Sequence, residues 1–303
     1  MIEFQDLKLE DKKIIDEYFR QGQYQNSECT FTNLFIWRDC YAVQWTVIDG
    51  LLVIKPGQSD ESWILPPYGD YAQHDVQSVL LQMREYFAQQ GKPLVLRAVT
   101  EELRVMLEQS CPGMFEFEEE RDLEDYLYNG ADLRELKGRK YHSKRNHLSN
   151  FHKNYPDYVY EPLTADMREE VWEYINLWCK QKECSGKFSD GLICEKKAIR
   201  EALDFFEELD YVGAVIRIQG QIEAFTMGEM LNDNTVVIHV EKANGLINGL
   251  YGAINQEFLL HAWPDVQFVN REEDTGDEGL RKAKLSYQPV QLVKKYKGVF
   301  KNA

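Results

Sequence analysis

The feature that most constrains the fold lies in the carboxy-terminal part of the chain, where an apolar strand runs into a glycine-spaced helix. Val236–Val240 is apolar enough to predict a strand, Glu241–Asn244 follows it, and Gly245, Gly249 and Gly252 mark the first turns of the predicted helix. The first turn of such a helix leaves backbone N–H groups unpaired. Because these groups attract anions, the pattern suits a phosphate or a thioester carrier. Close packing of the helix on the sheet is the alternative reason for the glycines.

A second polar segment follows the next predicted strand, Val266–Val269. It reads Asn270-Arg271-Glu272-Glu273-Asp274, and strand ends are the usual place for sites in α/β sheets. A carboxylate there can hold an α-ammonium group, and Arg or Lys can hold an oxyanion. The alternative is a loop and an amphipathic helix whose ion pairs contribute little to stability.

These two segments supply the candidate site residues. The candidates for the base that takes the nucleophile's proton, provided that burial raises the pKa, are Glu241, Glu272 and Asp274. The candidates for holding the donor are Asn244, Gly249 and Gly252, and those for holding the substrate are Asn270, Arg271, Lys282 and Tyr287. We find no pattern of metal ligands, and His239 is expected to be a hydrogen-bonded core or pocket residue.

A basic segment, Lys137–Lys153, contains six Lys or Arg and three of the six histidines but no carboxylate. One interpretation is a strip that binds the phosphates of a tRNA acceptor stem, coenzyme A or a lipid headgroup. Its members would be Arg139, Lys140, Lys144, Arg145 and His147. The other interpretation is a solvated connector helix whose charges pair with the acidic domains.

Composition limits the partners and the compartment. The formal net charge of -16 opposes non-specific binding to nucleic acid or anionic lipid, so any such contact must be local. The six cysteines form no CxxC pair and the amino terminus lacks a signal-like apolar segment, which predicts free thiols in the cytoplasm. No apolar run reaches the roughly 20 residues of a membrane span. A lipid substrate would therefore be met from the water side, at the inner membrane surface.

The order of predicted elements indicates two similar halves. In both halves a hairpin is followed by a helix, a strand, a second helix and closing strands. The first half is predicted to contain helices at Lys12–Arg20, Phe31–Trp37, Asp75–Gln90 and Glu101–Gln109, a hairpin at Val43–Ile54, a strand at Pro93–Val99 and closing strands at Phe115–Phe117 and Tyr126–Tyr128. The second half is predicted to contain a hairpin at Val212–Met230, helices at about Ile247–Ala262 and at Glu278–Ser286, and a closing strand at Val290–Tyr296. The predicted boundary lies near Asn129-Gly130, which divides the chain into residues 1–130 and 131–303. A long helix from Leu133 to Tyr155, with a possible break, would join the halves.

The motifs together resemble a known family. Residues 138–147, 240–244, 270–274 and 279–284 are similar to bacterial proteins related to the C-terminal domain of phosphatidylglycerol lysyltransferase. This resemblance implies an α/β (α+β) chain of two tandem acetyltransferase-like (GNAT) domains, each a mixed central sheet flanked by helices. The same arrangement occurs in the Fem peptidoglycan aminoacyltransferases, which use aminoacyl-tRNA. The 303 residues of this sequence do not include the flippase portion of the full lysyltransferase or the coiled-coil arm of some Fem enzymes, so we expect neither a lipid nor a peptidoglycan precursor to be favoured as the acceptor on this resemblance alone.

The resemblance implies an acyltransferase whose carboxy-terminal domain is the active one and whose first domain is degenerate. The expected co-substrate is aminoacyl-tRNA or acyl-coenzyme A, with no tightly bound cofactor, and the expected acceptor is the hydroxyl or amine of a small molecule, lipid headgroup or peptide. Two alternatives are an acyl-coenzyme A-dependent N-acyltransferase and a module that binds a ligand without chemistry.

Overall fold

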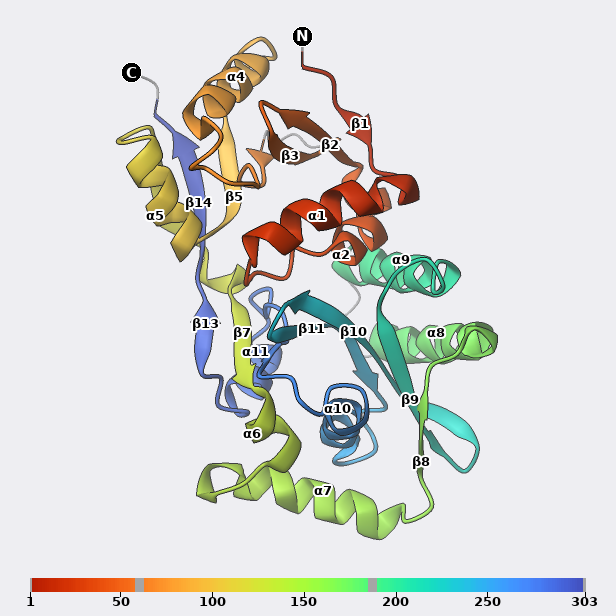
Figure 1. The fold of residues 1–303 in the computed structure, drawn as a ribbon. Coiled ribbons are helices and arrows are strands. Elements are labelled where there is room, and N and C mark those ends of the chain that lie inside the picture. Colours follow the sequence, from red (N-terminus) through yellow and green to blue (C-terminus); the bar gives the residue numbers. More distant parts are fainter. Residues whose placement is uncertain (1, 58–62, 185–189, 302–303) are drawn as a thin grey trace. The chain divides into compact units, whose positions relative to one another are not determined.

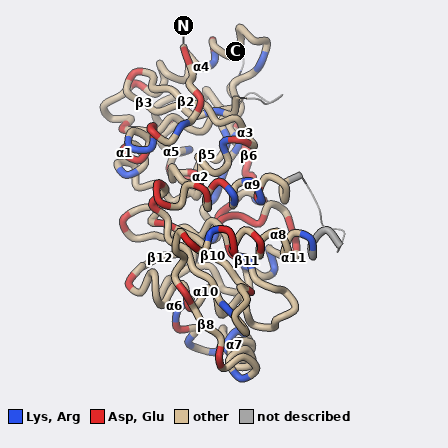
Figure 2. The backbone as a smooth tube through the Cα atoms, turned by 90° about the vertical axis from the view of Figure 1, so that its right-hand side faces the viewer, with Lys and Arg blue, Asp and Glu red and all other residues tan. Residues whose placement is uncertain are grey.

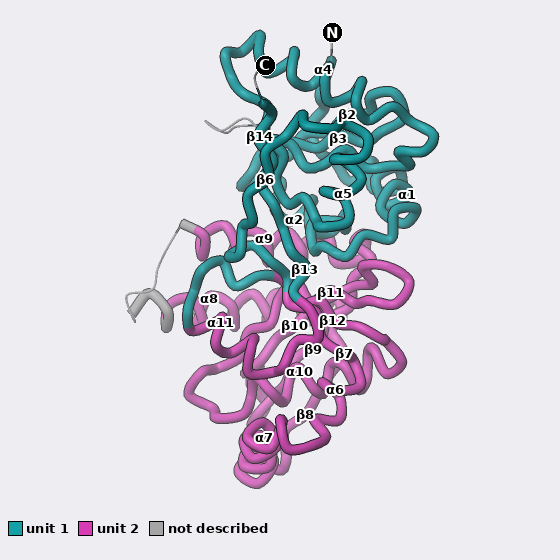
Figure 3. Tube along the Cα trace, turned by 90° about the vertical axis from the view of Figure 1, so that its left-hand side faces the viewer, with its two compact units in different colours: residues 1–125, 273–278, 292–303 teal, residues 126–272, 279–291 magenta. Residues whose placement is uncertain are grey.

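The computed structural model describes residues 2–57, 63–184 and 190–301. The chain divides into two compact units, coloured separately in Figure 3. The first unit contains residues 1–125, 273–278 and 292–303, and the second contains residues 126–272 and 279–291. The expected division at residue 130 was sequential, whereas the first unit also contains two segments from the carboxy-terminal end of the chain.

The first unit is built on two small sheets (Figure 1). One has the order β1-β2-β3, and the other has the order β4-β5-β14-β6. The strands are β1 Gln5–Asp6, β2 Val43–Ile48, β3 Leu51–Pro56, β4 Trp63–Ile64, β5 Val95–Thr100, β6 Phe115–Glu119 and β14 Lys295–Phe300. The helices are α1 Lys12–Gly22, α2 Phe31–Ile36, α3 Arg38–Tyr41, α4 Val76–Ala88 and α5 Glu101–Ser110, with 3-10 turns η1 Leu9–Asp11 and η2 Arg121–Leu123.

Local sequence accounts for these elements. Asp49 and Gly50 both have positive φ, and they make the tight turn that joins β2 to β3. Helices α2, α4 and α5 begin where the side chains of Thr30, Asp75 and Thr100 accept a backbone N–H from the first turn. The predicted hairpin and helices of this half are therefore confirmed.

The second unit contains a seven-stranded sheet with the order β13-β7-β12-β11-β10-β9-β8. Its strands are β7 Asp125–Asn129, β8 Val159–Pro162, β9 Val212–Ile218, β10 Gln221–Asn232, β11 Thr235–Ala243, β12 Phe268–Asn270 and β13 Gln291–Val293. Strands β11 and β12 are parallel, and their neighbours β10 and β7 run antiparallel to them. The helices are α6 Gly130–Glu135, α7 His142–Asn154, α8 Arg168–Cys184, α9 Asp190–Asp204, α10 Leu250–His261 and α11 Glu278–Leu285, with 3-10 turns η3 Arg139–Tyr141 and η4 Ala165–Met167.

The connector predicted over Leu133–Tyr155 is divided into α6, η3 and α7 rather than continuous. The chain turns where Leu136 and Gly138 adopt positive φ, which ends α6. Leu148 and Phe151 are the buried side chains of α7, and they belong to a core cluster that also contains Leu250 and Ile254 of α10. The apolar side of the connector thus packs on the helix that follows β11.

The two halves exchange their closing strands. Strand β7 follows the first half in sequence but lies in the seven-stranded sheet, between β12 and β13. Strand β14 ends the chain but lies in the first unit, between β5 and β6. The prediction that Tyr126–Tyr128 closes the first half was wrong, and the strand predicted over Val290–Tyr296 is two strands, one in each sheet. Periodicity identifies a strand, but it does not reveal which partner supplies the backbone hydrogen bonds.

The cysteines correct one expectation. Cys29, Cys111 and Cys179 are free, buried thiols. Cys40 takes part in a disulfide, and so does Cys194, so the expectation of free thiols was wrong for each of these residues. Pairing depends on the distance between Cα atoms, which spacing along the chain does not reveal.

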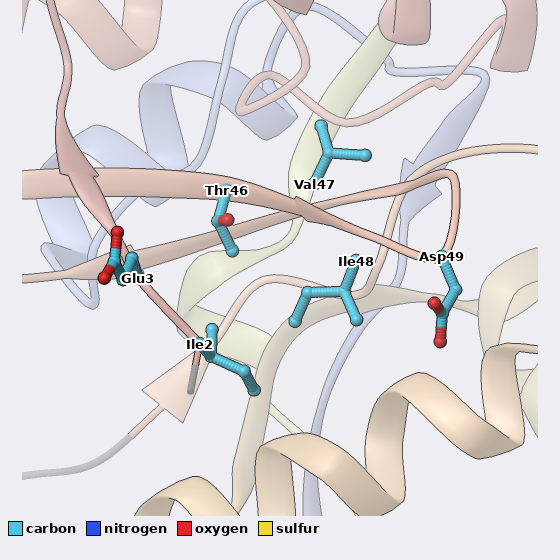
Figure 4. Close-up of a pocket in the computed structure, with 6 residues that line it drawn as sticks. All are labelled: Ile2, Glu3, Thr46, Val47, Ile48 and Asp49. Carbon is cyan, nitrogen blue, oxygen red and sulfur yellow. The ribbon is translucent and has the colours of Figure 1, made fainter.

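Two further observations concern surfaces. In the part of the chain that the structure describes, no helix has the length and apolar character needed to cross a bilayer. The hollow in Figure 4 belongs to the first unit and is lined by Ile2, Glu3, Thr46, Val47, Ile48 and Asp49. Its charged side chains are both carboxylates, so it is poorly suited to an anionic carrier.

Candidate functional site

The strongest candidate site lies where the parallel strands β11 and β12 of the second unit end at a common edge. The two strands pair through Val236 with Val269 and Val237 with Asn270, so the residues after Asn270 extend beside the end of β11. His239 and Glu241 belong to the second half of β11, and the β10–β11 register shifts at His239, which stands between Ile238, paired with Gly228, and Val240, paired with Met227. The carboxyl ends of parallel strands are where α/β folds place binding groups.

Glu241 and Arg271 form a largely buried ion pair. Arg271 Nη2 lies 2.7 Å from Glu241 Oε1, and the two side chains are 12% and 11% exposed. Asn255 of α10 donates to the other oxygen, Glu241 Oε2, at 2.8 Å. Arg271 Nη1 is buried and has no acceptor among the described residues. Arg271 and Asn255 thus hold the carboxylate of Glu241 in place, and its role as the base stays a prediction.

Lys144 joins this cluster from α7. Its ammonium lies 3.8 Å from the centre of the Tyr287 ring, and the Arg271 guanidinium lies 5.0 Å from the same ring. Burial, and then the nearby charge of Arg271, lower the pKa of Lys144 to about 8. The described residues offer Lys144 no carboxylate partner. The cluster therefore carries more positive than negative charge.

A second group of charges surrounds His239. Its ring nitrogens lie 2.9 Å from Glu272 Oε1 and 2.9 Å from Glu229 Oε1, and its side chain is 2% exposed. Burial opposes protonation, but the hydrogen bonds and charges of Glu229 and Glu272 outweigh it and raise the pKa of His239 to about 9. A hydrogen-bonded, buried His239 confirms the expectation for this residue.

The turn that carries Arg271 and Glu272 is held from several sides. Glu272 has φ +55, and its backbone N–H donates to Asn270 Oδ1 at 2.7 Å. Lys284 Nζ donates to the carbonyl oxygens of Arg271 and Glu272. Positive φ is costly for a residue with a side chain, so these contacts fix a conformation that the segment alone disfavours.

The start of α10 packs closely against α7. A Cβ on Gly249, which has φ +89, would lie 2.4 Å from the carbonyl oxygen of His147 on α7. His147 Nδ1 lies 3.0 Å from Asn248 Oδ1, and Asn244 donates to Glu223 at 2.8 Å. A Cβ on Gly252 would lie 3.3 Å from the Tyr287 hydroxyl. Close approach of α7 thus explains Gly249, and anion binding by this turn stays a prediction.

The predicted basic strip separates into residues with different contacts. Figure 2 colours the Lys and Arg positions along the backbone blue. Arg145 donates to the carbonyl oxygens of Leu136 and Gly138, so it caps the end of α6. Lys140 pairs with Asp132 at 2.8 Å, and Arg139 is exposed. Of the expected phosphate-binding residues, Lys144 alone joins the Glu241 and Arg271 cluster.

The remaining predicted residues are divided between the units. Asn270 is fully buried at the end of β12, Lys282 is exposed on α11, and the ring of Tyr287 lies close to the cations of both Lys144 and Arg271. Asp274 belongs to the first unit, where it is buried, lies 3.6 Å from Arg121 and accepts the Gly276 N–H. These contacts of Asp274 lie within the first unit, and its role as a base stays a prediction.

Sequence reasoning missed Glu229, Asn255 and Lys284. Glu229 was detectable in principle because it is a carboxylate within the apolar run of β10, where an unpaired charge would be costly. Asn255 and Lys284 sit on helices with ordinary polar positions, and only the packing of α10 and α11 reveals their partners.

The fold and this site define the class of protein: a tandem chain of the GNAT type with a charged site at the end of its parallel strands. The tandem GNAT protein from the clavulanic acid biosynthesis pathway is similar, with a TM-score of 0.51 and 8% identity over 99% of each chain. This similarity confirms the predicted fold class.

The sequence matches the profile of the phosphatidylglycerol lysyltransferase C-terminal family over residues 19–297, so the chain belongs to that family. A conserved protein of unknown function from Bacteroides thetaiotaomicron VPI-5482 is 38% identical, with a TM-score of 0.93, over 99% of this chain and 100% of that one. The L-PGS structure from Bacillus licheniformis is 14% identical, with a TM-score of 0.66, over 97% and 93%. A search of curated proteins found no match.

Proposed function

We propose that this protein transfers an acyl group, and specifically an aminoacyl group from aminoacyl-tRNA, to a hydroxyl or amine. The observation that carries the proposal is the Lys144, Glu241 and Arg271 cluster at the shared end of β11 and β12, in a chain of the lysyltransferase family. Buried cations at such a position stabilise the oxyanion that develops on the carbonyl oxygen under attack.

The chemistry needs three roles. The nucleophile attacks the donor carbonyl carbon, the carrier leaves with the bonding electrons, and a base accepts the nucleophile's proton. Arg271, held by Glu241, would face the developing negative charge. Of the two predicted bases in the second unit, Glu272 is 23% exposed and Glu241 is 11% exposed. Glu272 is therefore the more accessible one and the candidate for the base.

The test is turnover with a donor panel. Radiolabelled aminoacyl-tRNAs and acyl-coenzyme A thioesters are incubated with hydroxyl and amine acceptors, and labelled product is counted. Arg271→Gln should lower the rate at least about tenfold because a charge-assisted contact is lost. Lys153→Gln, an exposed change on the same helix as Lys144, should leave the rate unchanged.

Other results with the donor panel would favour one of the two alternative functions. Turnover with thioesters alone favours the acyl-coenzyme A-dependent N-acyltransferase. A donor that raises the melting temperature without forming product, across the whole panel, favours a ligand-binding module and contradicts transfer.

A further inference from the structure

The cluster at Tyr287 concentrates positive charge in a chain whose net charge is -16. Lys144 and Arg271 approach the same aromatic ring, at 3.8 Å and 5.0 Å from its centre. Glu241 is the carboxylate paired with Arg271, and Lys144 has no carboxylate partner among the described residues. Two cations thus share the neighbourhood of one compensating anion.

This arrangement is unfavourable for the protein by itself. Lys144 is half-buried beside another cation, and this environment disfavours its charged form. Arg271 has a buried Nη1 without an acceptor, although a guanidinium offers five N–H donors. Unpaired buried cations are uncommon because desolvation is costly, and where they occur they tend to mark functional sites.

The neighbours of Lys144 determine which ligand would offset the desolvation cost of the two cations. Tyr287 presents its ring to the ammonium, Arg271 adds a second positive charge, and Lys284 is occupied with backbone carbonyls. An anion gains from both cations, whereas a second cation, such as a lysyl side chain, would be repelled. Arg271 is the more deeply buried of the two and Lys144 is about half-buried, so Lys144 is the residue that an incoming anion meets first.

We propose that Lys144, supported by Arg271 and Tyr287, binds a phosphate oxyanion of the substrate. Lys144 makes the direct contact, and Arg271 supplies the deeper positive charge. This inference rests on the proposed function and deepens it, because it assigns a phosphate ester rather than a cationic aminoacyl side chain to this subsite. The phosphate has several sources: coenzyme A, a tRNA end or a phospholipid headgroup.

The test measures how fast individual lysines are acetylated by a limiting amount of N-hydroxysuccinimide acetate, with mass spectrometry of the peptides. Inorganic phosphate is compared with chloride at equal ionic strength. A bound anion favours the charged, unreactive ammonium. An increase of one unit in the pKa of Lys144 would therefore slow its acetylation at pH 8 about fivefold. Lys153, exposed in the last turn of the same helix, is the internal control.

Variants give an independent readout. Phosphate should raise the melting temperature of the natural protein and of Lys153→Gln but not that of Lys144→Gln. Without phosphate, Lys144→Gln should melt at a higher temperature than the natural protein, since it removes a cation held beside Arg271. Equal protection of Lys144 and Lys153, or protection by chloride, overturns the proposal.

Three further arms identify the source of the phosphate. Coenzyme A, uncharged tRNA and vesicles that contain phosphatidylglycerol replace inorganic phosphate in the acetylation assay, and the arm that protects Lys144 at the lowest concentration supplies the ligand. Protection of Lys144 without acyl transfer would support the site and contradict the proposed function. Acyl transfer without protection of Lys144 would support the proposed function and contradict the phosphate site.

Discussion

At the scale of the residue, β11 contributes one member to each of two buried charge groups: Glu241 to one and His239 to the other. Glu241 with Arg271 is an ion pair, and His239 is an imidazole between the carboxylates of Glu229 and Glu272. Removing one member of such a group leaves the others buried and unpaired, which costs more than the pair contributes. Each residue therefore matters through its partners.

His239 makes stability depend on pH. Its folded pKa of about 9 lies above the ordinary value of 6.5, so the stabilisation is fully present below about pH 6.5 and is lost as the pH rises through 9. The difference corresponds to about 3 kcal/mol. Urea unfolding of the natural protein at pH 6.5 and 9.5 should show this loss.

The matched variants for this prediction are two histidine substitutions. His239→Gln should remove most of the loss and should lower stability at pH 6.5, because Glu229 and Glu272 then lack a cation. His261→Gln changes a largely exposed histidine and should leave the pH dependence intact. Equal pH dependence in natural protein and His239→Gln would refute the role of His239.

At the scale of the element, the contact between α7 and the start of α10 sets the shape of the site. Gly249 allows the carbonyl oxygen of His147 to approach, and Lys144 lies one turn earlier on the same helix. The position of α7 therefore determines whether Lys144 reaches Tyr287. The contact between Gly249 and His147 is a packing contact, and it positions Lys144 of the same helix α7.

Gly249→Ala should destabilise the protein by about 1–3 kcal/mol because of its positive φ, with a further cost from the clash with His147. Gly245→Ala is the control, since a Cβ at Gly245 has no neighbour within 4 Å. Thermal unfolding checks both variants. If the two variants unfolded at the same temperature, the close approach of α7 would not matter.

At the scale of the whole molecule, the exchanged strands tie each unit to a distant part of the sequence. Lys295 of β14 is fully buried in the first unit and lies 2.7 Å from Asp125 and 2.8 Å from Glu28. Burial opposes its charge, but these carboxylates outweigh burial and raise the pKa of Lys295. The first unit is therefore complete only when the end of the chain has been added.

Lys295→Met should lower stability by about 3–5 kcal/mol because it leaves Asp125 and Glu28 without their cation. Lys297→Met, on the same strand and partly exposed, should have a small effect. Hydrogen exchange should show that the loss is concentrated in β5 and β6, the neighbours of β14. Uniform destabilisation across both units would contradict this local role.

The sequence by itself determined the types of most elements, the family and part of the site. Apolar periodicity and turn residues are local, and they placed α1, α4, the β2–β3 and β9–β10 hairpins and the strand before Glu241. The prediction of a site after the strand Val266–Val269 also named Arg271, which belongs to the cluster with Glu241, and Glu272, which contacts His239, because strand ends are the usual place for sites in α/β sheets.

Only the tertiary structure decided which residues meet. The exchange of β7 and β14, the assignment of Asp274 to the first unit and the separate roles of Arg145 and Lys144 all depend on contacts between distant segments. Hydrogen bonding and Coulomb interactions act over a few ångströms in space, whatever the separation along the chain. A sequence records which charges exist, and the packing of α7 against the strand ends determines which of them lack a partner.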